Sequence, residues 1–397
     1  MTYKELLTSH KIVRQLSYVQ FIAYFGAWFS NVAIYSMLIE LNASAFLISS
    51  VVAVHLIPGI ILAPFSGTIV DRLNVKKLML ILLSIEFIMT LMFLTINTLD
   101  DIWFLMLLLF IRMGSASAFF TTEMTLLPKL LSGEALIKAN EIHSIIWSFT
   151  FTAGMAMGGF IVNLYGVKVS FLIDGAFFIV ALLILSQIDF KIQSTKTTDT
   201  IMQSIKSGVG YLKNNKYLFH FMILHATVGL TAFDTLVTLL ADYHYKYIIA
   251  VPLAIGLSNS VRAFALMIGP LFITNIVNKH TITYVFIAQG ISIIIWANLQ
   301  FNFYYALFGL FLTGLTTTTI WSYTYAILQD KVEQAYLGRV LAYNEMIFML
   351  VNISTTFFIG FMASYIELST ITMCLGVAFF FVAYYYYYNL TATKIFQ

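Results

Sequence analysis

Long apolar runs constrain this sequence more than any other feature. A bilayer core about 30 Å thick needs roughly 20 apolar residues per spanning helix, and twelve runs of that kind follow one another along the 397 residues. Since 60% of the residues are hydrophobic and only 10% are charged, the apolar surface exceeds what a soluble core could bury. We therefore predict an all-α membrane protein with transmembrane helices near residues 14–41, 44–70, 77–97, 101–122, 137–165, 169–189, 217–245, 250–276, 281–298, 301–326, 337–363 and 368–388.

The longest polar segment lies between the sixth and seventh runs. It contains the stretch KIQSTKTTDTIMQSIKSGVGYLKNNK, which can form an amphipathic helix on the membrane surface. The sequence thus predicts an N-terminal six-helix bundle at 1–189, a cytoplasmic linker at 190–216 and a C-terminal six-helix bundle at 217–397. Similar residues recur between the halves at an offset near 203, where Asn31 matches Asp234 and Glu86 matches Gln289. Such repeats are common in secondary transporters.

The basic residues define an orientation. Placing the amino terminus in the cytoplasm puts seventeen of the 21 lysines and arginines on that side, and only Lys168 and Lys246 opposite. The remaining two, Arg112 and Arg262, fall inside membrane runs. Because cytoplasmic loops carry an excess of lysine and arginine, we expect a multi-pass protein of a bacterial cytoplasmic membrane with both termini in the cytoplasm.

Several function classes are disfavoured by the composition. Cys374 is the only cysteine, which excludes an intrachain disulfide and a thiolate metal site. The net charge of +3 is spread over short clusters, so nucleic-acid binding is not expected. The chain shows no nucleotide-binding glycine loop, HExxH pair or catalytic serine motif. We therefore do not expect an enzyme, a cofactor or a bound metal. The energy for transport would come from a gradient.

The loop expected between the second and third helices reads GTIVDRLNVKKL. It resembles the signature loop G-x-x-x-D-R-x-x-R-K of the major facilitator superfamily, with a one-residue slip before the last basic pair. The matching positions are Gly67, Asp71, Arg72, Lys76 and Lys77. The resemblance implies a major facilitator fold and a cytoplasmic gate, in which Asp71 caps the eleventh helix and Arg72 pairs with Glu123. In the alternative interpretation these charges only end the helices and set their orientation.

Further stretches add to this resemblance. The fifth helix carries Gly154, Gly158 and Gly159 in an arrangement similar to the antiporter motif G-x-x-x-G-P-x-x-G-G, with Thr150 and Met155 as departures. Close packing between membrane helices explains such glycines equally well. Residues 108–114 are similar to the membrane-embedded arginine motif of drug antiporters. Residues 136–140 and 336–340 resemble the branch with macrolide efflux proteins and the enterobactin exporter, and 136–140 is also similar to lysophospholipid transporters.

Ionisable residues inside a membrane are functional candidates because each is costly to bury. Asp234 is the first choice for proton coupling, and Glu345 and His225 are the other candidates. The alternatives are a structural carboxylate for Asp234, a gate contact for Glu345 and a local hydrogen bond for His225. The family resemblance implies that the first, fourth, seventh and tenth helices line a central cavity, and it leaves Glu86 and Asp174 on peripheral helices.

Seven residues are substrate-cavity candidates: six lie on these helices, and Arg262, in the eighth helix, offers the same chemistry as Arg112 from the other half. Two arginines can hold an anionic group or tune a carboxylate, although fixed ion pairs between helices would explain them as well. The aromatic candidates suit an amphipathic or aromatic cargo, although aromatic residues also pack or face lipid. The candidates are Asn31, Arg112, Arg262, Trp28, Phe119, Trp321 and Tyr323.

The combined prediction is a proton-coupled secondary active exporter that moves an amphipathic small molecule, such as a drug or siderophore, by alternating access. Its partners would be the small molecule, protons and the lipid bilayer, and we expect it to function as a monomer. One alternative is a lysophospholipid flippase in which Arg112 or Arg262 binds phosphate. Others are a metabolite symporter or facilitator, and a transporter-shaped sensor.

Overall fold

The structure is a computed structural model that describes residues 2–62, 74–190, 201–273, 277–333 and 335–391. The chain divides into two compact units. Unit 1 comprises Met1–Ala43 and Val54–Ile201, and unit 2 comprises Ser44–Ala53 and Met202–Gln397. Unit 2 thus contains the short segment Ser44–Ala53 in addition to the C-terminal half of the chain.

Within these described ranges, twelve helices are long and apolar enough to cross a membrane by length and composition. The expected number of spans and the all-α fold class are confirmed. The fourth and tenth spans, Leu99–Leu130 and Phe303–Lys331, run past the ends predicted for them. Hydropathy marks only the apolar part of a helix, whereas backbone hydrogen bonding continues through polar residues such as Glu123.

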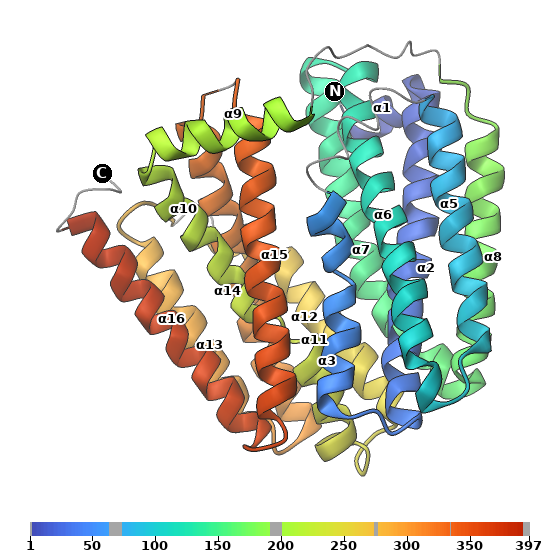
Figure 1. The fold of residues 1–397 in the computed structure, drawn as a ribbon, viewed down its shortest axis with the longest axis vertical. Coiled ribbons are helices and arrows are strands. Elements are labelled where there is room, and N and C mark those ends of the chain that lie inside the picture. The colour runs from blue at the N-terminus through green and yellow to red at the C-terminus, as the bar shows by residue number, and fades with distance from the viewer. Residues whose placement is uncertain (1, 63–73, 191–200, 274–276, 334, 392–397) are drawn as a thin grey trace. The chain divides into compact units, whose positions relative to one another are not determined.

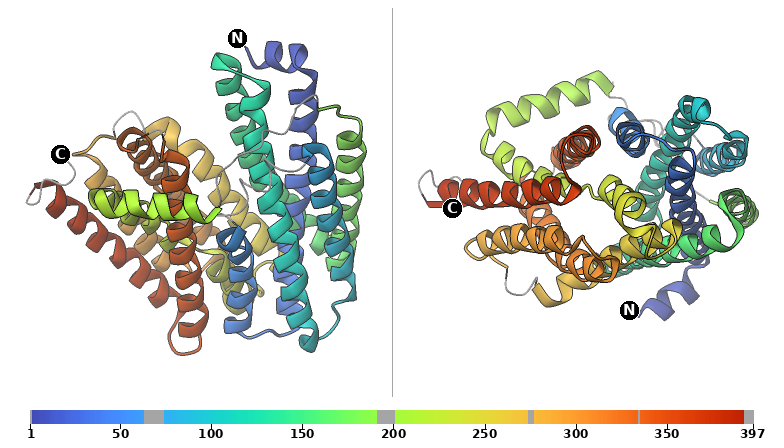
Figure 2. Two further views of the ribbon diagram at one scale, coloured as in Figure 1. Left: turned by 45° about the horizontal axis from the view of Figure 1, so that its top comes forward. Right: turned by 90° about the horizontal axis from the view of Figure 1, so that it is seen from below.

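Unit 1 is an all-helical bundle whose long helices run side by side (Figures 1 and 2). Its helices are α1 (Tyr3–Ser9), α2 (Lys11–Glu40), α5 (Val75–Met92), α6 (Ile102–Leu130), α7 (Gly133–Tyr165) and α8 (Val167–Ser186). Helix α2 packs against α7 and α8, and α5 packs against α6 and α8. The second span, Ala45–Leu62, is divided between the units, because its first helix, α3 (Ala45–Val54), belongs almost entirely to unit 2.

The core of unit 1 lies where α2, α5, α6 and α8 meet. Leu16, Met79, Phe119 and Phe178 are all buried there in one apolar cluster. Dispersion and shape complementarity, more than hydrophobic exclusion, hold such helices together inside lipid. Side chains from every one of these helices therefore fix the positions of the polar groups between them.

Unit 2 contains the remaining spans and one helix of the linker. Its helices are α9 (Ile201–Asn214), α10 (Tyr217–Ala226), α11 (Asp234–Leu240), α12 (Val251–Ile273), α13 (Ile282–Leu299), α14 (Phe303–Lys331), α15 (Leu337–Met362) and α16 (Leu368–Thr391). Helix α12 packs against α14, and α13 packs against α14 and α16 (Figure 2).

The linker helix α9 docks on the segment that joins α14 to α15. The rings of Tyr211 and Tyr336 stack with centroids 4.3 Å apart, and Arg339 Nη1 donates to Ser207 Oγ over 2.7 Å. Tyr211 Oη accepts from the backbone N–H of Glu333 at 3.1 Å. Helix α9 of the linker is therefore held in one place on unit 2 by these contacts.

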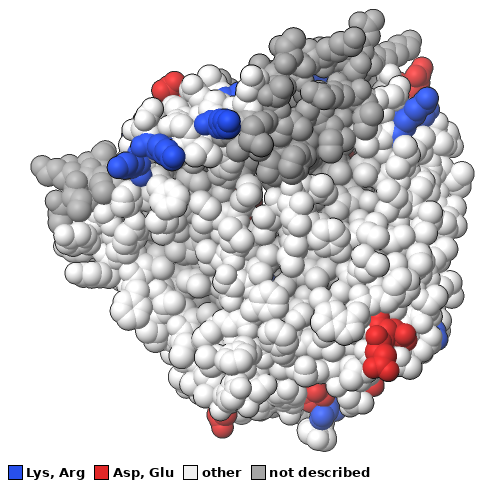
Figure 3. Space-filling view, in the orientation of Figure 1, with Lys and Arg blue, Asp and Glu red and all other residues white. Residues whose placement is uncertain are grey.

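Among the described residues on the face shown in Figure 3, charged side chains lie at the ends of the helices, and the surface between these ends is uncharged. Large apolar side chains such as Leu107, Leu183 and Phe381 are exposed at 53%, 58% and 70%. Exposed apolar surface of this extent fits contact with lipid acyl chains.

Candidate functional site

The seventh span is broken near its middle. It begins as α10, tightens into a 3₁₀ turn at Thr227–Thr231, leaves helical geometry at Ala232 and Phe233, and resumes as α11 at Asp234. Gly229 lies against the backbone of α15, where an added Cβ would come within 2.9 Å of the carbonyl oxygen of Phe348. Interrupted membrane helices expose backbone groups that other parts of the protein must satisfy.

Arg262 of α12 satisfies one of these groups. Its Nη2 donates to the carbonyl oxygen of Thr231 over 2.7 Å, and its guanidinium lies 5.1 Å from the centre of the Phe233 ring. It also interacts electrostatically with Asp234, which occupies the first turn of α11. The structure thus joins two sequence-predicted residues, Arg262 and Asp234, at the break.

His225 lies one turn before the break and is fully buried. Its Nδ1 is 2.9 Å from Thr324 Oγ1 of α14. The single hydroxyl proton of Thr324 is directed to the carbonyl oxygen of Ile320, at 2.8 Å. With that proton on the Ile320 oxygen, Thr324 accepts from His225, and the neutral imidazole then carries its proton on Nδ1.

This tautomer leaves a lone pair on Nε2 of His225. Nε2 lies 3.8 Å from Glu345 Oε1 of α15 and has no hydrogen-bond partner among the described residues. The Glu345 side chain is 29% exposed, whereas that of His225 is fully buried. A proton reaching Glu345 can therefore be shared with an imidazole nitrogen that is already oriented to receive it.

Aromatic rings enclose this pair. The Trp321 ring lies 4.3 Å from the His225 ring and meets Phe348 edge-on at 4.8 Å. Tyr325 lies 5.6 Å from the imidazole and interacts electrostatically with Glu345. Trp321, a cavity candidate, thus belongs to the same site as His225 and Glu345.

Arg112 in unit 1 lies in a buried ion pair between helices. Its Nη2 is 2.7 Å from Asp174 Oδ2 of α8, and its Nη1 donates to Ser30 Oγ of α2 at 3.0 Å. The rings of Phe93 and Phe178 flank the guanidinium, each centroid 5.5 Å from Cζ. Since Arg112 is only 2% exposed, it fits the fixed ion pair better than a substrate contact. Asp174, assigned by resemblance to a peripheral helix, is its partner.

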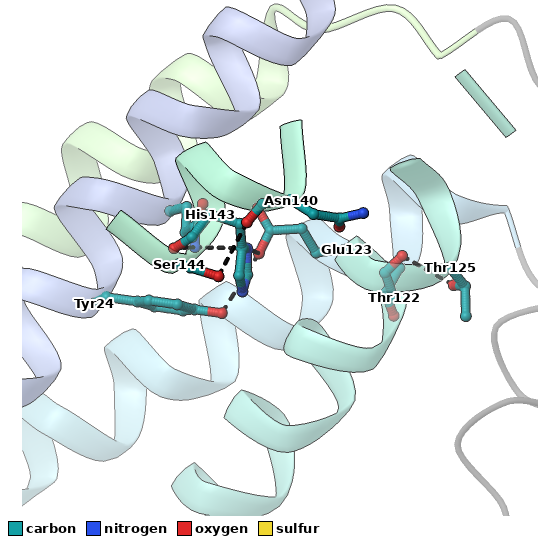
Figure 4. Close-up of polar contacts among 8 residues, drawn as sticks. Tyr24, Thr122, Glu123, Thr125, Asn140, His143 and Ser144 are labelled. Carbon is teal, nitrogen blue, oxygen red and sulfur yellow. Dashed lines mark hydrogen bonds and ion pairs between the residues drawn. The ribbon is translucent and has the colours of Figure 1, made fainter. Parts of the chain in front are cut away.

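Glu123 lies in a second buried cluster of unit 1. Figure 4 shows it with Tyr24 of α2 and His143 of α7, and the three side chains converge from three helices. Tyr24 Oη donates to Glu123 Oε2 at 3.4 Å, and His143 Nδ1 lies 3.8 Å from the same oxygen. Gln20 Nε2 donates to His143 Nδ1 at 2.7 Å.

The expected cytoplasmic gate falls largely outside the described residues. Gly67, Asp71 and Arg72 lie there, so the expected contact between Arg72 and Glu123 remains a prediction. Lys76 and Lys77 lie in the first turn of α5, where the Lys77 backbone N–H donates to the Asn74 side chain at 3.1 Å.

Other cavity candidates have different surroundings. Phe119 is 2% exposed and packs inside the apolar core. Asn31 Oδ1 lies 3.3 Å from His55 Nε2. The half-buried Trp28 ring lies 4.2 Å from the Phe151 ring. Tyr323 interacts with Tyr386 of α16, which separates it from the Trp321 cluster.

The antiporter-like glycines lie where α7 meets α2. A Cβ added at Gly158 would lie 2.5 Å from the carbonyl oxygen of Phe29, and one at Gly154 would lie 2.9 Å from Trp28 Cβ. Gly159 is also buried. These contacts favour the packing interpretation, because only glycine lets the two helices approach so closely.

Sequence reasoning missed the partners of the candidate residues. Tyr24, His143, Thr324 and Tyr325 contact candidate carboxylates or imidazoles from other helices. A signal for His143 was present, since it is an ionisable residue within an apolar run. Nothing local distinguishes Thr324 from the other threonines of its span.

Twelve spans with ion pairs buried between them define a class of polytopic membrane proteins that move solutes. The sequence model of the Major Facilitator Superfamily matches residues 16–261, more than half of the chain. The chain therefore belongs to the major facilitator superfamily, and it is a multi-pass membrane transporter.

Known proteins similar to this chain agree with that family. Macrolide efflux protein A of Streptococcus pyogenes is 24% identical over 327 residues, covering 79% of each chain. Macrolide efflux protein A of Enterococcus faecalis is 23% identical over 301 residues, covering 72% of this chain and 91% of that protein. The crystal structure of the nucleoside transporter NupG matches with a TM-score of 0.77 at 14% identity, covering 96% and 99% of the two chains. At 14% identity, the similarity to NupG shows only that the two proteins share a fold.

Proposed function

We propose that this transporter exports an amphipathic small molecule in exchange for protons, by alternating access, across the cytoplasmic membrane of a bacterium. Both termini would face the cytoplasm, and one copy of the chain would suffice. The observation that supports proton coupling most directly is the His225–Glu345 pair. Its imidazole is buried with Nδ1 committed to Thr324, so that Nε2 faces a partly exposed carboxylate at 3.8 Å.

One proton changes the charge of this pair from −1 to 0. A neutral imidazole beside an ionised Glu345 carries −1, and a proton bound by either group cancels that charge. Burying an uncompensated charge costs free energy, so the two protonation states favour different surroundings. Coupling requires that cargo and proton bind the two transport conformations with different affinities.

Asp234 and Arg262 supply the second part of the proposed mechanism. Asp234 follows the break in the span that carries His225, nine positions further along, and Arg262 reaches this break from α12. A cargo that disturbs the Arg262 contact with Thr231 would change the charge environment of Asp234. Asp234 therefore remains a candidate for proton coupling, either in place of Glu345 or together with it.

The aromatic shell suggests the kind of cargo. Trp321, Tyr325 and Phe348 offer ring faces beside a carboxylate, an arrangement that favours large apolar or cationic groups. The relatives named as macrolide efflux proteins make a macrolide the first cargo to test. The phosphate-binding role on which the flippase alternative depends gains no support from Arg112, since Asp174 already pairs with it.

The test uses purified full-length protein in liposomes. A pH gradient, acidic inside, should drive accumulation of a labelled macrolide through inside-out copies. We expect Glu345→Gln to lower this accumulation at least tenfold while cargo-for-cargo exchange continues. Glu367→Gln, which changes an exposed carboxylate at the start of the last span, is the matched control.

Three results would each contradict a different part of the proposal. If Glu345→Gln keeps gradient-driven accumulation with the pH dependence of the unmodified protein, Glu345 does not couple protons. If Asp234→Asn alone removes the dependence on the gradient, the coupling site is at the break. Accumulation without any dependence on the gradient would favour a facilitator.

A further inference from the structure

A second carboxylate–imidazole pair lies in unit 1, and it is built on the same three spans of its half. His225, Thr324 and Glu345 come from the first, fourth and fifth spans of the C-terminal half. Tyr24, Glu123 and His143 come from the first, fourth and fifth spans of the N-terminal half. The residue types are permuted, so the acid is on the fourth span in unit 1 and on the fifth in unit 2.

The two pairs also have the same separation. His143 Nδ1 lies 3.8 Å from Glu123 Oε2, and His225 Nε2 lies 3.8 Å from Glu345 Oε1. The side chains of Glu123 and His143 are 3% and 10% exposed. The unit 1 pair is therefore shielded on the carboxylate side, whereas the unit 2 pair opens there.

Hydrogen bonds around His143 define two states of the unit 1 pair. Gln20 Nε2 is only a donor, so Nδ1 of His143 accepts from it at 2.7 Å and carries no proton in this arrangement. A proton arriving on Nδ1 would meet the carboxylate of Glu123, and the Gln20 amide would turn to present its oxygen. The alternative place for the same proton is the carboxyl of Glu123.

The remaining nitrogen of His143, Nε2, holds the ring proton in the first state. It is buried and has no hydrogen-bond partner among the described residues. The incoming proton must therefore bind Nδ1 or the Glu123 carboxylate, which are the acceptors of the pair. Uptake of one proton from water changes the charge of the pair from −1 to 0, as in unit 2. No other reactant is needed.

Few other ionisable groups face this pair. Tyr24 donates to Glu123 at 3.4 Å from α2. Glu86 of α5 is 5% exposed and interacts electrostatically with Tyr24. The ring of Phe120 covers one side of the imidazole, with centroids 5.4 Å apart. Arg72, the expected partner of Glu123, lies outside the described residues.

We propose that Glu123 and His143 form a second proton-binding site, so that the transporter exchanges two protons for each cargo molecule, one bound in each unit. The link to transport depends on the proton-coupled exchange proposed above, whereas proton binding by the pair does not. Two measurements therefore test the two parts separately.

The first measurement is an infrared titration of the cargo-free, full-length protein. Difference spectra between alkaline and acidic pH report carboxyl groups that gain protons. We expect Glu123→Gln to remove one buried carboxyl band and Glu345→Gln to remove another. Glu141→Gln, two residues from His143 but exposed and paired with Lys138 at 2.7 Å, should leave both bands in place. A Glu123→Gln spectrum identical to that of the unmodified protein would overturn the proposal.

A second variant protects this test against simple misfolding. His143→Gln keeps a polar side chain but cannot share the proton, so it should shift the pH at which the Glu123 band appears without removing the band. If His143→Gln leaves that titration unchanged, the two residues do not act as a pair, and the proposal fails.

The second measurement counts protons. With the membrane potential clamped at zero, the limiting accumulation ratio for two protons is about a hundredfold per pH unit, and for one proton about tenfold, since each proton contributes 1.36 kcal/mol per unit. We expect the limiting accumulation ratio per pH unit to fall from about a hundredfold in the unmodified protein to about tenfold in Glu123→Gln. A tenfold ratio in both proteins would refute a second exchanged proton. No gradient-driven flux in the unmodified protein would refute the proposed function, while the infrared titration still decides proton binding.

Discussion

Replacing Gly158 by alanine tests how closely α2 and α7 must pack. The new Cβ would lie 2.5 Å from the carbonyl oxygen of Phe29 and 3.2 Å from its Cα, whereas ordinary van der Waals contact begins at 3.4 Å. The helices would have to separate locally by roughly 0.9 Å, which is the overpacking that typically costs about 1–3 kcal/mol. The better helix propensity of alanine returns about 0.8–1 kcal/mol.

The net effect is a destabilisation of up to about 2 kcal/mol, with a central value of about 1 kcal/mol. In units of 150–250 residues, 1 kcal/mol shifts Tm by about 2–4 °C, so the apparent Tm in detergent should fall by about 2–4 °C and by no more than about 8 °C. Thermal melts followed by intrinsic fluorescence would measure this shift. Gradient-driven cargo flux at a temperature below both transitions should be retained if packing is the main role of this glycine.

Gly114→Ala is the matched control within the same unit. Its Cβ would meet Leu62 Cδ1 at 3.4 Å and Pro58 Cβ at 3.6 Å, which is ordinary contact. We expect it to melt at the temperature of the unmodified protein or above it. If Gly158→Ala melts as high as Gly114→Ala, the packing argument is wrong. Loss of coupled flux at an unchanged Tm would instead favour the antiporter interpretation of the motif.

Three further changes have definite expected outcomes. Asp174→Asn leaves the buried charge of Arg112 without its partner and should cost about 3–5 kcal/mol, measured by thermal melts, whereas replacing both residues by apolar ones should cost less. Thr324→Val removes the acceptor that fixes the tautomer of His225, and should lower gradient-driven flux severalfold and shift its pH profile without lowering the protein yield. The hydrogen bond from the Thr2 backbone N–H lowers the pKa of Glu5. The stability that the ionised Glu5 gives to α1 is therefore fully present above the pKa of Glu5 in the unfolded chain, and it is lost as the pH falls through the lower pKa of the folded state. The protection of the α1 amides against hydrogen exchange should decrease as the pH falls over that range.

The number of spans was predictable from the sequence because the bilayer sets it directly. Each helix must carry enough apolar residues to cross about 30 Å of hydrocarbon, and that requirement is local. The break in the seventh span was not predictable. Residues 227–233 are as apolar as their neighbours and contain no proline. At the break, Arg262 reaches the Thr231 carbonyl oxygen from another helix, a contact that the sequence of the span does not reveal.

The candidate site was predictable as a set of residues but not as a set of pairs. Glu345, His225 and Arg112 were found because ionisable groups inside apolar runs are rare. Their partners depend on helix packing, which single-sequence reasoning does not supply. Asp174 shows this: its helix looked peripheral by resemblance, yet its carboxylate lies 2.7 Å from Arg112. Phe119 shows the converse, since its helix was expected at a cavity and its ring lies in the core.

The two carboxylate–imidazole pairs differ in a way that suits successive steps of one exchange cycle. Glu345 is 29% exposed and can exchange protons with water directly, whereas Glu123 is 3% exposed and needs an opening first. A site that is open to water in this conformation couples proton to cargo only if its proton affinity or its access differs in the other conformation. A shielded site exchanges its proton only when the surrounding helices move. The open pair of unit 2 and the buried pair of unit 1 would then take up their protons at different steps of the cycle, each coupling one proton, so that Glu123→Gln keeps one-proton exchange.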